Sequence, residues 1–93
     1  MKIRKAYQNN SFVVEFNNES VSPMICWCME TFSNGKIVFS LDEYLKTSLK
    51  YNWIVILDRY EMENDESRNI SMQILFKKTA DTLVFKLKYS ELF

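Results

Sequence analysis

The chain has 93 residues, a length that fits one domain, and its 12 basic residues balance 12 acidic ones, so the formal net charge is zero. It contains no histidine, which excludes a Ser-His-Asp or Cys-His catalytic couple and an imidazole metal site. Its single glycine, Gly35, excludes the phosphate-binding loop and the dinucleotide-binding fingerprint, which both need several glycines. Hydrophobic residues make up 47% of the chain, too many for a disordered protein, so we expect a single packed domain over residues 1–93.

The sequence carries no recognisable targeting signal. Its longest apolar runs, residues 24–29 and 53–57, are far shorter than the roughly 20 residues that span a bilayer. The basic N-terminus is not followed by an apolar stretch of signal-peptide length. Two cysteines one residue apart form no disulfide framework, so we expect a cytoplasmic protein with reduced thiols and no membrane contact.

The first element in the chain is a β-hairpin. Residues 2–8 and 11–16 predict two short strands around Asn9-Asn10, because asparagine tolerates the left-handed conformation of a tight turn. Phe12, Val14 and Phe16 share one face of the second strand, which indicates that this face is buried.

Residues 23–32 allow two interpretations. The alternation of Ile25, Trp27 and Met29 favours a strand, and the pair Asn34-Gly35 before the apolar residues 37–39 is typical of a hairpin turn. Alternatively, Ser22 caps a helix and Pro23 occupies its first turn. We favour the strand.

The next segment predicts a helix over about 41–51. Ser40 can cap the helix and Glu43 completes a capping box three residues later. An apolar stripe follows at helical spacing, formed by Leu41, Tyr44, Leu45 and Leu49. Residues 53–57 are apolar on both faces and rich in β-branched side chains, which predicts a central strand. The helical spacing is also continued by Trp53, Ile56, Leu57 and Tyr60, so one helix from 41 to 62 is the alternative.

The remaining chain predicts a loop and two strands. Residues 61–69 are polar and acidic, whereas residues 70–76 and 83–89 alternate and are joined by a hairpin link at 78–81. The predicted fold is therefore α+β: a mainly antiparallel, twisted sheet of about five to seven short strands, with one principal helix (about 41–51) packed on it. The order of the strands does not follow from one sequence.

Cys26-Trp27-Cys28 is the first candidate site. Two thiolates could begin a zinc site, but the chain has no histidine and no further cysteine to complete it. On a strand, Cys26 and Cys28 would share a face, where a disulfide between them would be strained. We expect both cysteines to act as small buried hydrophobic residues.

Acidic residues gather after the strand at 53–57. Five acids lie within residues 58–66, and Arg59 and Arg68 reduce the local net charge to −3. A carboxylate pair for acid–base chemistry or a Mg²⁺ site would need a formed pocket, of which the spacing gives no sign. Two interpretations remain: the acidic segment recognises another protein, or it is a solvated loop that only keeps the domain soluble. The candidate partner-binding residues are Asp58, Tyr60, Glu61, Glu63, Asp65 and Glu66.

Basic residues occur near both ends of the chain, namely Lys2, Arg4, Lys5, Lys77, Lys78, Lys86 and Lys88. If the terminal strands are neighbours, these side chains form a stripe that could bind single-stranded nucleic acid, with Tyr7 or Tyr89 for stacking. Lysines on solvent faces of strands more often protect sheet edges from other chains. Five Met, two Trp and seven Phe are also more than a core of this size can hide, which indicates an apolar surface patch.

No spacing arranges a nucleophile with its base, so we expect no enzyme, no metal and no cofactor. The leading hypothesis is a small protein-binding module that neutralises another protein by occluding its working surface, as an immunity protein, an antitoxin or a phage-encoded inhibitor does. An acidic loop would suit a toxin or nuclease with a basic surface. The alternatives are a nucleic-acid-binding module that uses the terminal lysines, or a homo-oligomeric structural subunit such as a homodimer.

Overall fold

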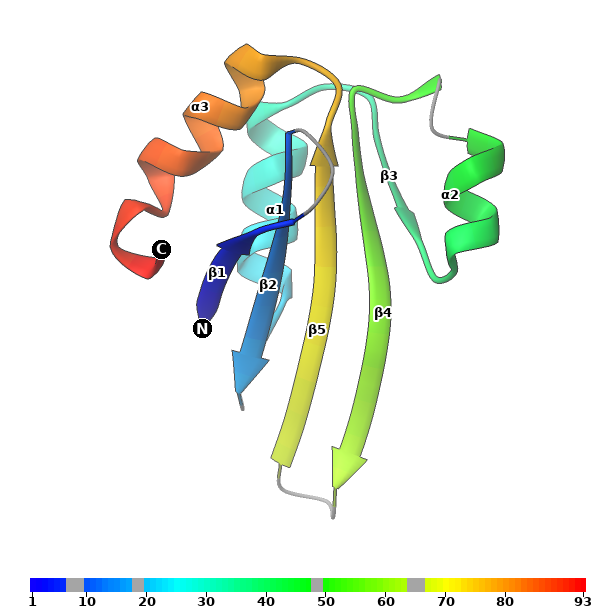
Figure 1. The fold of residues 1–93 in the computed structure, drawn as a ribbon, viewed down its shortest axis with the longest axis vertical. Helices are drawn as coiled ribbons and strands as arrows, with labels where there is room; N and C mark the ends of the chain where they lie inside the picture. The colour runs from blue at the N-terminus through cyan, green and yellow to red at the C-terminus, as the bar shows by residue number, and fades with distance from the viewer. Residues whose placement is uncertain (7–9, 18–19, 48–49, 64–66) are drawn as a thin grey trace.

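The computed structural model describes residues 1–6, 10–17, 20–47, 50–63 and 67–93, with the backbone alone described at 47, 58–63 and 67–69. Figure 1 shows its strands and helices around one sheet. In chain order they are β1 (Lys2–Lys5), β2 (Ser11–Asn17), α1 (Ser22–Thr31), β3 (Gly35–Val38), α2 (Leu41–Thr47), β4 (Trp53–Glu63), β5 (Ser67–Phe76), α3 (Thr79–Lys88) and the 3₁₀ turn η2 (Ser90–Leu92). No helix in these described ranges is long and apolar enough to cross a bilayer.

The five strands form one mixed sheet in the order β1-β2-β5-β4-β3. Three neighbouring pairs are antiparallel, whereas β3 runs parallel to β4. The α+β class is therefore confirmed. The prediction of a single principal helix is wrong, because the described chain contains three α-helices.

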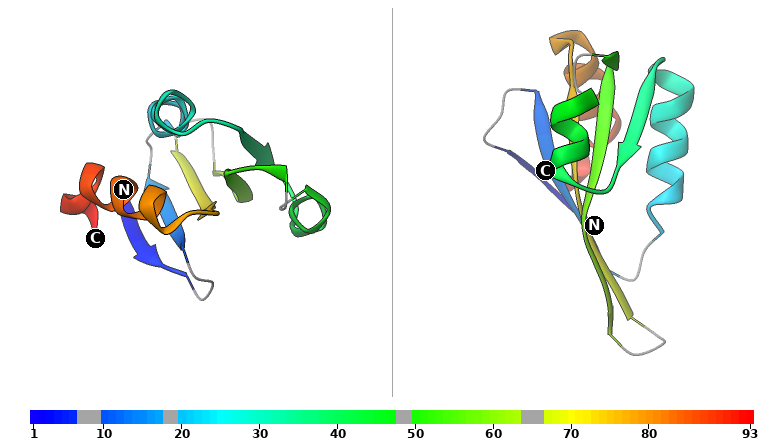
Figure 2. Two further views of the ribbon diagram at one scale, coloured as in Figure 1. Left: turned by 90° about the horizontal axis from the view of Figure 1, so that it is seen from above. Right: turned by 90° about the vertical axis from the view of Figure 1, so that its right-hand side faces the viewer.

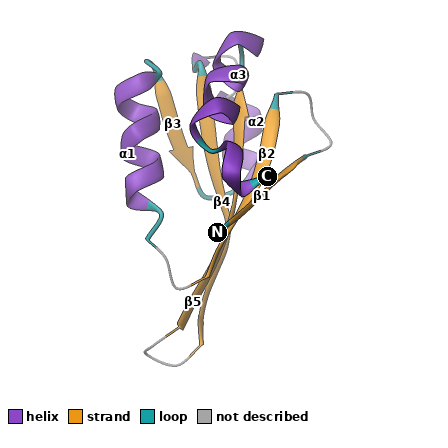
Figure 3. Cartoon of the chain, turned by 90° about the vertical axis from the view of Figure 1, so that its left-hand side faces the viewer, coloured by secondary structure: helices purple, strands orange, loops and turns teal. Residues whose placement is uncertain are grey.

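The helices cover both faces of the sheet (Figures 2 and 3). One face lies under α1 and α3 and carries the larger core cluster, which includes Phe12, Trp53 and Phe85. The opposite face carries a smaller cluster of Val38, Ile54, Ile56 and Leu75, against which Tyr44 of α2 and Tyr51 pack. The two clusters differ in size because α2 covers only the β3–β4 part of its face.

The N-terminal hairpin is confirmed over Lys2–Lys5 and Ser11–Asn17, whereas residues 7–9, with Asn9, lie outside the described residues. β1 pairs antiparallel with β2, so that Ile3 lies opposite Val14. Asn10 has a φ of 60°, the left-handed conformation that its sequence position predicts. Phe12, Val14 and Phe16 are all buried, as their alternation indicates.

The favoured strand at residues 23–32 is wrong, and the helical alternative is correct. Its expected cap is wrong, because Val21 and not Ser22 is the N-cap residue, and its side chain makes no capping hydrogen bond. Pro23 lies in the first turn of α1, where its missing N–H costs no hydrogen bond. Met24, Cys28 and Phe32 follow one another at intervals of four and are all buried. The expected hairpin at 33–36 is also wrong, because Asn34, with a φ of 61°, turns the chain from α1 into the parallel strand β3.

The expected strand at 83–89 is wrong as well. Residues 79–88 form α3, which buries Thr82 and Phe85 against the sheet. The alternating apolar residues misled the prediction because Leu83 and Leu87 are not core residues: their side chains are 55% and 78% exposed. The segment 78–81 is accordingly the entry into a helix rather than a hairpin.

The helix predicted over 41–51 begins as expected and ends earlier, at Thr47. The Ser40 hydroxyl accepts a hydrogen bond from the backbone N–H of Glu43 at 3.2 Å, which confirms the cap. The predicted apolar stripe is largely wrong, because Leu41 and Leu45 are 59% and 66% exposed and only Tyr44 packs inward. Leu49 lies outside the described residues.

The central strand predicted at 53–57 is confirmed, and the long helix from 41 to 62 is wrong. β4 does not end at Leu57 but continues to Glu63, and β5 already begins at Ser67. Most of the loop expected at 61–69 is therefore strand, because residues 61–63 pair across the hairpin with residues 67–69.

Candidate protein-binding site

The β4–β5 hairpin projects beyond the rest of the sheet (Figure 1). β3 pairs with β4 only over Gly35–Val38, opposite Trp53–Ile56, and β2 reaches along β5 no further than Asn69. Beyond these points β4 and β5 pair only with each other, down to Glu63 and Ser67. We call this part, residues 57–63 of β4 and 67–68 of β5, the arm.

A β-bulge marks the root of the arm. The register of β4 against β5 shifts between Leu57 and Arg59, so that Asp58 is the extra residue. A bulge bends its strand and increases the local twist. Directly before it, Val55 and Ile56 are buried in the two core clusters, so the arm extends from a fixed base.

The structure brings most of the predicted partner-binding residues into one strand. Asp58, Tyr60, Glu61 and Glu63 all belong to the arm, where Tyr60 lies opposite Ile70 and Glu61 opposite Asn69. Asp65 and Glu66 lie outside the described residues. The acidic segment is thus carried mainly on a strand edge and not in a loop. On its outer side, this edge has no strand partner beyond Ile56 in the described chain.

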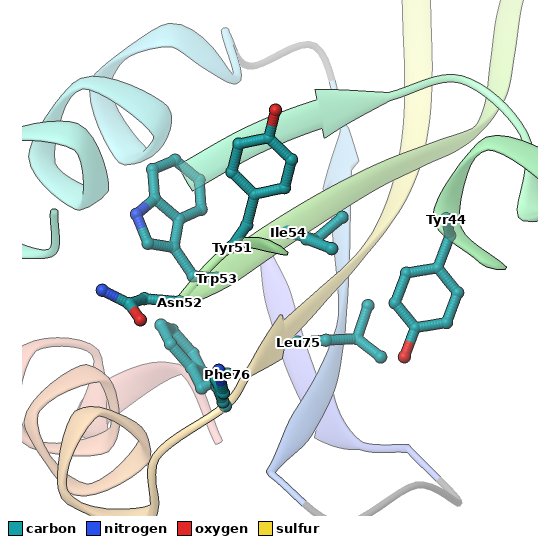
Figure 4. A pocket seen from close by; sticks show the side chains of 8 residues that line it. Tyr44, Tyr51, Asn52, Trp53, Ile54, Leu75 and Phe76 are labelled. Atoms are coloured by element: carbon teal, nitrogen blue, oxygen red, sulfur yellow. The ribbon is translucent and has the colours of Figure 1, made fainter. Parts of the chain in front are cut away.

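A second feature is a pocket on the α2 side of the sheet, shown in Figure 4. Its volume is about 190 Å³, and it is lined by Tyr44, Tyr51, Asn52, Trp53, Ile54, Leu75, Phe76 and Lys77. Small-molecule sites usually enclose about 300–1,000 Å³, so this hollow is smaller than a typical ligand site. The amide of Asn52 is already engaged, because its Nδ2 donates to the carbonyl of Ser33 at 3.0 Å.

Asn34 and Asn52 tie the pocket wall together. Asn34 Nδ2 donates to the carbonyl of Lys50 at 2.8 Å, and the backbone N–H of Asn52 donates to the carbonyl of Asn34 at 2.8 Å. Trp53 Nε1 donates to the carbonyl of Phe32 at 3.2 Å, which anchors β4 to the end of α1. These groups hold segments together and leave few polar atoms to orient a ligand.

The two cysteines differ in environment. On α1, Cys26 is exposed and Cys28 is buried, so the expectation of a shared face is wrong and only Cys28 acts as a buried hydrophobic residue. Burial raises the pKa of the Cys28 thiol to about 12. Burial and the neighbouring Cys28 also raise the pKa of Tyr89. Cys28 therefore stays a neutral thiol, the opposite of what a nucleophile or metal ligand requires. No group of three or more metal-binding side chains occurs among the residues that the structure describes.

The terminal lysines do not form the strand face that the sequence predicts. Lys86 and Lys88 lie on α3, and residues two apart on a helix point to different sides. The Lys88 ammonium lies over the Trp27 ring, 5.8 Å from its centre, whereas Lys86 is half-buried. Lys2, Arg4 and Lys5 are exposed on the edge strand β1, the position where charge protects a sheet from pairing with other chains.

Sequence reasoning missed the exposed apolar residues of the helices. Large side chains that remain exposed are Met29, Phe39, Leu41, Leu45, Leu83, Val84, Leu87 and Phe93. These residues are spread over α1, α2 with the preceding Phe39, α3 and the C-terminal residue, so they do not make one apolar patch. The signal that places some of them on α3 is the helical spacing of Leu83 and Leu87, which the strand interpretation hid.

Comparisons with protein-family models, with curated proteins and with solved structures find no match.

Proposed function

We propose that this protein is a small, non-enzymatic binding module that occludes the working surface of another protein, and that the arm is its contact element. The observation that carries the proposal is the outer edge of the arm: β4 continues seven residues, 57–63, past its last pair with β3, and the hairpin extends two residue pairs, Met62–Arg68 and Glu63–Ser67, beyond β2. An element of this kind can enter a concave surface while the body of the domain covers the rim.

Charge supports this proposal and points to the chemistry of the partner. Asp58, Glu61 and Glu63 are carried on β4, and Asp65 and Glu66 follow in the sequence. Complementary charge accelerates association and suppresses wrong partners. A toxin or nuclease with a basic site is therefore the target class, which agrees with the type of function that immunity proteins, antitoxins and phage-encoded inhibitors perform in the cytoplasm.

The backbone of the arm offers a second means of binding. The outer edge of β4 beyond Ile56 has no strand neighbour in the described chain, so its backbone groups are available to an extended segment of a partner. Acidic residues on this edge disfavour pairing with a second acidic edge of the same protein. The edge can thus pair with a basic strand of a partner, whereas pairing with the same edge of a second copy is disfavoured.

The first experiment is affinity capture from a lysate of the source cell, with protein and nucleic acid identified from the same eluate. The expected result is a stoichiometric protein partner with a basic surface. Captured nucleic acid that is lost at moderate salt would instead support the alternative function, a nucleic-acid-binding module that uses the terminal lysines. In that case Lys86→Glu and Lys88→Glu would weaken binding, whereas the arm hypothesis predicts little effect.

Matched variants then test the arm. One variant neutralises Glu61, Glu63, Asp65 and Glu66 to the corresponding amides, and the control neutralises Glu15, Glu30, Asp42 and Glu91, which lie elsewhere. Both change the net charge equally. We expect the arm variant to lose about tenfold or more in affinity, mainly through slower association, and the control to lose little. Equal losses would show that only the overall charge matters and would reject the arm as the contact.

A further inference from the structure

α3 is apolar on two opposite faces. Its inner face buries Phe85 among the aromatic residues of the larger core cluster. Its outer face carries the α3 stripe, which we define as Leu83, Val84 and Leu87, with exposed fractions of 55%, 41% and 78%. Leu83 and Leu87 are one turn apart, and Val84 lies next to them on the helix surface. A helix that is apolar on both sides normally has a neighbour on each.

Charged residues border the α3 stripe in a self-complementary pattern. Asp81 and Lys88 are seven residues apart, so they lie two turns apart on the same flank of α3, about 10.5 Å along the axis. Their midpoint, between residues 84 and 85, is also the middle of the stripe. The Lys88 ammonium lies 5.8 Å from the centre of the Trp27 ring, so this side chain already contacts α1 beside the stripe.

From this pattern we infer that the α3 stripe is the contact between two copies of this chain, with the two α3 helices packed antiparallel. A two-fold axis through the middle of the stripe brings Asp81 of each copy opposite Lys88 of the other and buries Leu83, Val84 and Leu87 between them. Parallel packing would instead place these flanks of the two copies on opposite sides of the contact, where Asp81 and Lys88 cannot pair. The pairs of Asp81 with Lys88 therefore favour the antiparallel orientation of two copies.

The dimer contact is separate from the arm. α3 follows Phe76, the last residue of β5, whereas the arm contains the first residues of that strand. Figure 1 shows α3 and the arm at opposite ends of the sheet. The helix contact is small beside the roughly 800 Å² per partner of a standard interface, so we expect a weak, concentration-dependent dimer. If no dimer is found, the proposed function of the arm is unaffected, because dimerisation is tested with variants of α3 and partner binding with variants of the arm.

The oligomeric state of the full chain tests the contact. Sedimentation equilibrium over concentrations on the order of 1 µM to 1 mM should show a monomer–dimer equilibrium. Leu87→Glu should raise the dimer dissociation constant by about tenfold or more, because it places a charge in the apolar contact. The matched control is Leu45→Glu, which changes a leucine on α2 that is 66% exposed, against 78% for Leu87, and should leave the dissociation constant unchanged.

A charge exchange tests the orientation. Asp81→Lys and Lys88→Asp should each weaken the dimer by about fivefold to tenfold, and the double variant should restore it to within about threefold of the original value. Each single variant also places a charge against the helix dipole, so thermal unfolding is recorded to separate folding from association. Restoration in the double variant cannot come from helix stability, because both of its charges oppose the dipole.

Three outcomes would overturn the inference. A monomer throughout the concentration range would reject the dimer, and a dimer equally weakened by Leu45→Glu would place the contact elsewhere. A monomer that binds vesicles of anionic phospholipid and loses this binding in Leu87→Glu would assign the α3 stripe to a lipid surface.

Discussion

The two faces of the sheet are built by different physical means. The face under α1 and α3 is joined by aromatic contacts between residues far apart in the sequence, such as Phe12 with Phe85, whose ring centres are 5.1 Å apart. The face under α2 depends on a locally capped helix that reaches the sheet through Tyr44. Contacts between distant residues therefore stabilise the face under α1 and α3, whereas a local capping hydrogen bond starts the helix that covers the other face.

This difference explains the different exposure of the helices. α1 buries Met24, Ile25 and Cys28, whereas α2 leaves Leu41 and Leu45 in solvent. A seven-residue helix has few hydrogen bonds to offset the cost of its nucleation, so α2 depends on its cap and on one aromatic contact. The comparison predicts that core substitutions under α1 and α3 cost much more stability than changes on α2.

The largest expected effect is at Phe85. Its ring also lies 5.4 Å from that of Phe76 and 5.1 Å from that of Tyr89, between centres. Phe85→Ala should lower the free energy of unfolding by about 3–5 kcal/mol, because it leaves a cavity between α3 and the sheet. Tyr44→Ala on the other face should cost only about 1 kcal/mol, because that ring is half-buried. Urea unfolding measures both, and equal losses would contradict the comparison.

The second effect is a loss of stability at alkaline pH. The pKa of Cys28 is raised to about 12 in the folded protein from an ordinary value of 9.0. Above pH 9 the unfolded chain therefore releases a proton that the folded chain keeps, and the free energy of unfolding falls by about 1.4 kcal/mol per pH unit from this group. Cys28→Ala should remove this part of the slope, whereas Cys26→Ser should keep it. Identical slopes in all three proteins would reject the assignment.

The third effect concerns the contact of β3 with β4. Gly35 lies opposite Trp53, and a Cβ at position 35 would overlap the indole ring. Gly35→Ala should cost about 1–3 kcal/mol, through overpacking and not through backbone strain. A double-mutant cycle with Trp53→Leu separates these causes. The cost of Gly35→Ala should shrink when the indole is absent, and an unchanged cost would place the strain in the backbone.

The smallest effect is at the start of α2. Ser40→Ala removes the acceptor of the Glu43 N–H and should cost about 1 kcal/mol. Ser22→Ala at the start of α1 is the matched control and should stay within about 0.5 kcal/mol, since the Ser22 backbone N–H, which donates to Ser20 Oγ at 3.2 Å, is kept in the variant. Thermal unfolding of both variants checks the difference. A larger cost at Ser22 would mean that α1, too, depends on its first residues.

The same contrast decides which elements could be predicted from the sequence. The start of α2 follows from Ser40 and Glu43, and the N-terminal hairpin from Asn10, because each signal acts over a few residues. α1 and α3 fit both the strand and the helix period. Whether these two segments form helices or strands depends on contacts that one sequence does not reveal, such as those of Phe85 with Phe12 and Phe76.

The sequence predicts which acidic residues make up the candidate site, but it places them in a loop, whereas the structure has four of the six candidate residues on strand β4. Glu61 and Glu63 look like loop residues because acidic side chains are rare in strands. Pairing with the start of β5 nevertheless keeps them in a strand, and this pairing depends on the buried part of the same two strands, where Val55 lies opposite Ile74. The bulge at Asp58 has no signal in the sequence.

The unequal burial of the two cysteines has a practical consequence. A maleimide dye or nitroxide spin label should attach to the unaltered chain at Cys26 alone, because Cys28 is enclosed and neutral. The label would report from the outer side of α1, next to Trp27, whose fluorescence it could quench. If two copies pair through the α3 stripe, the distance between their two labels could be measured without introducing or removing a single residue.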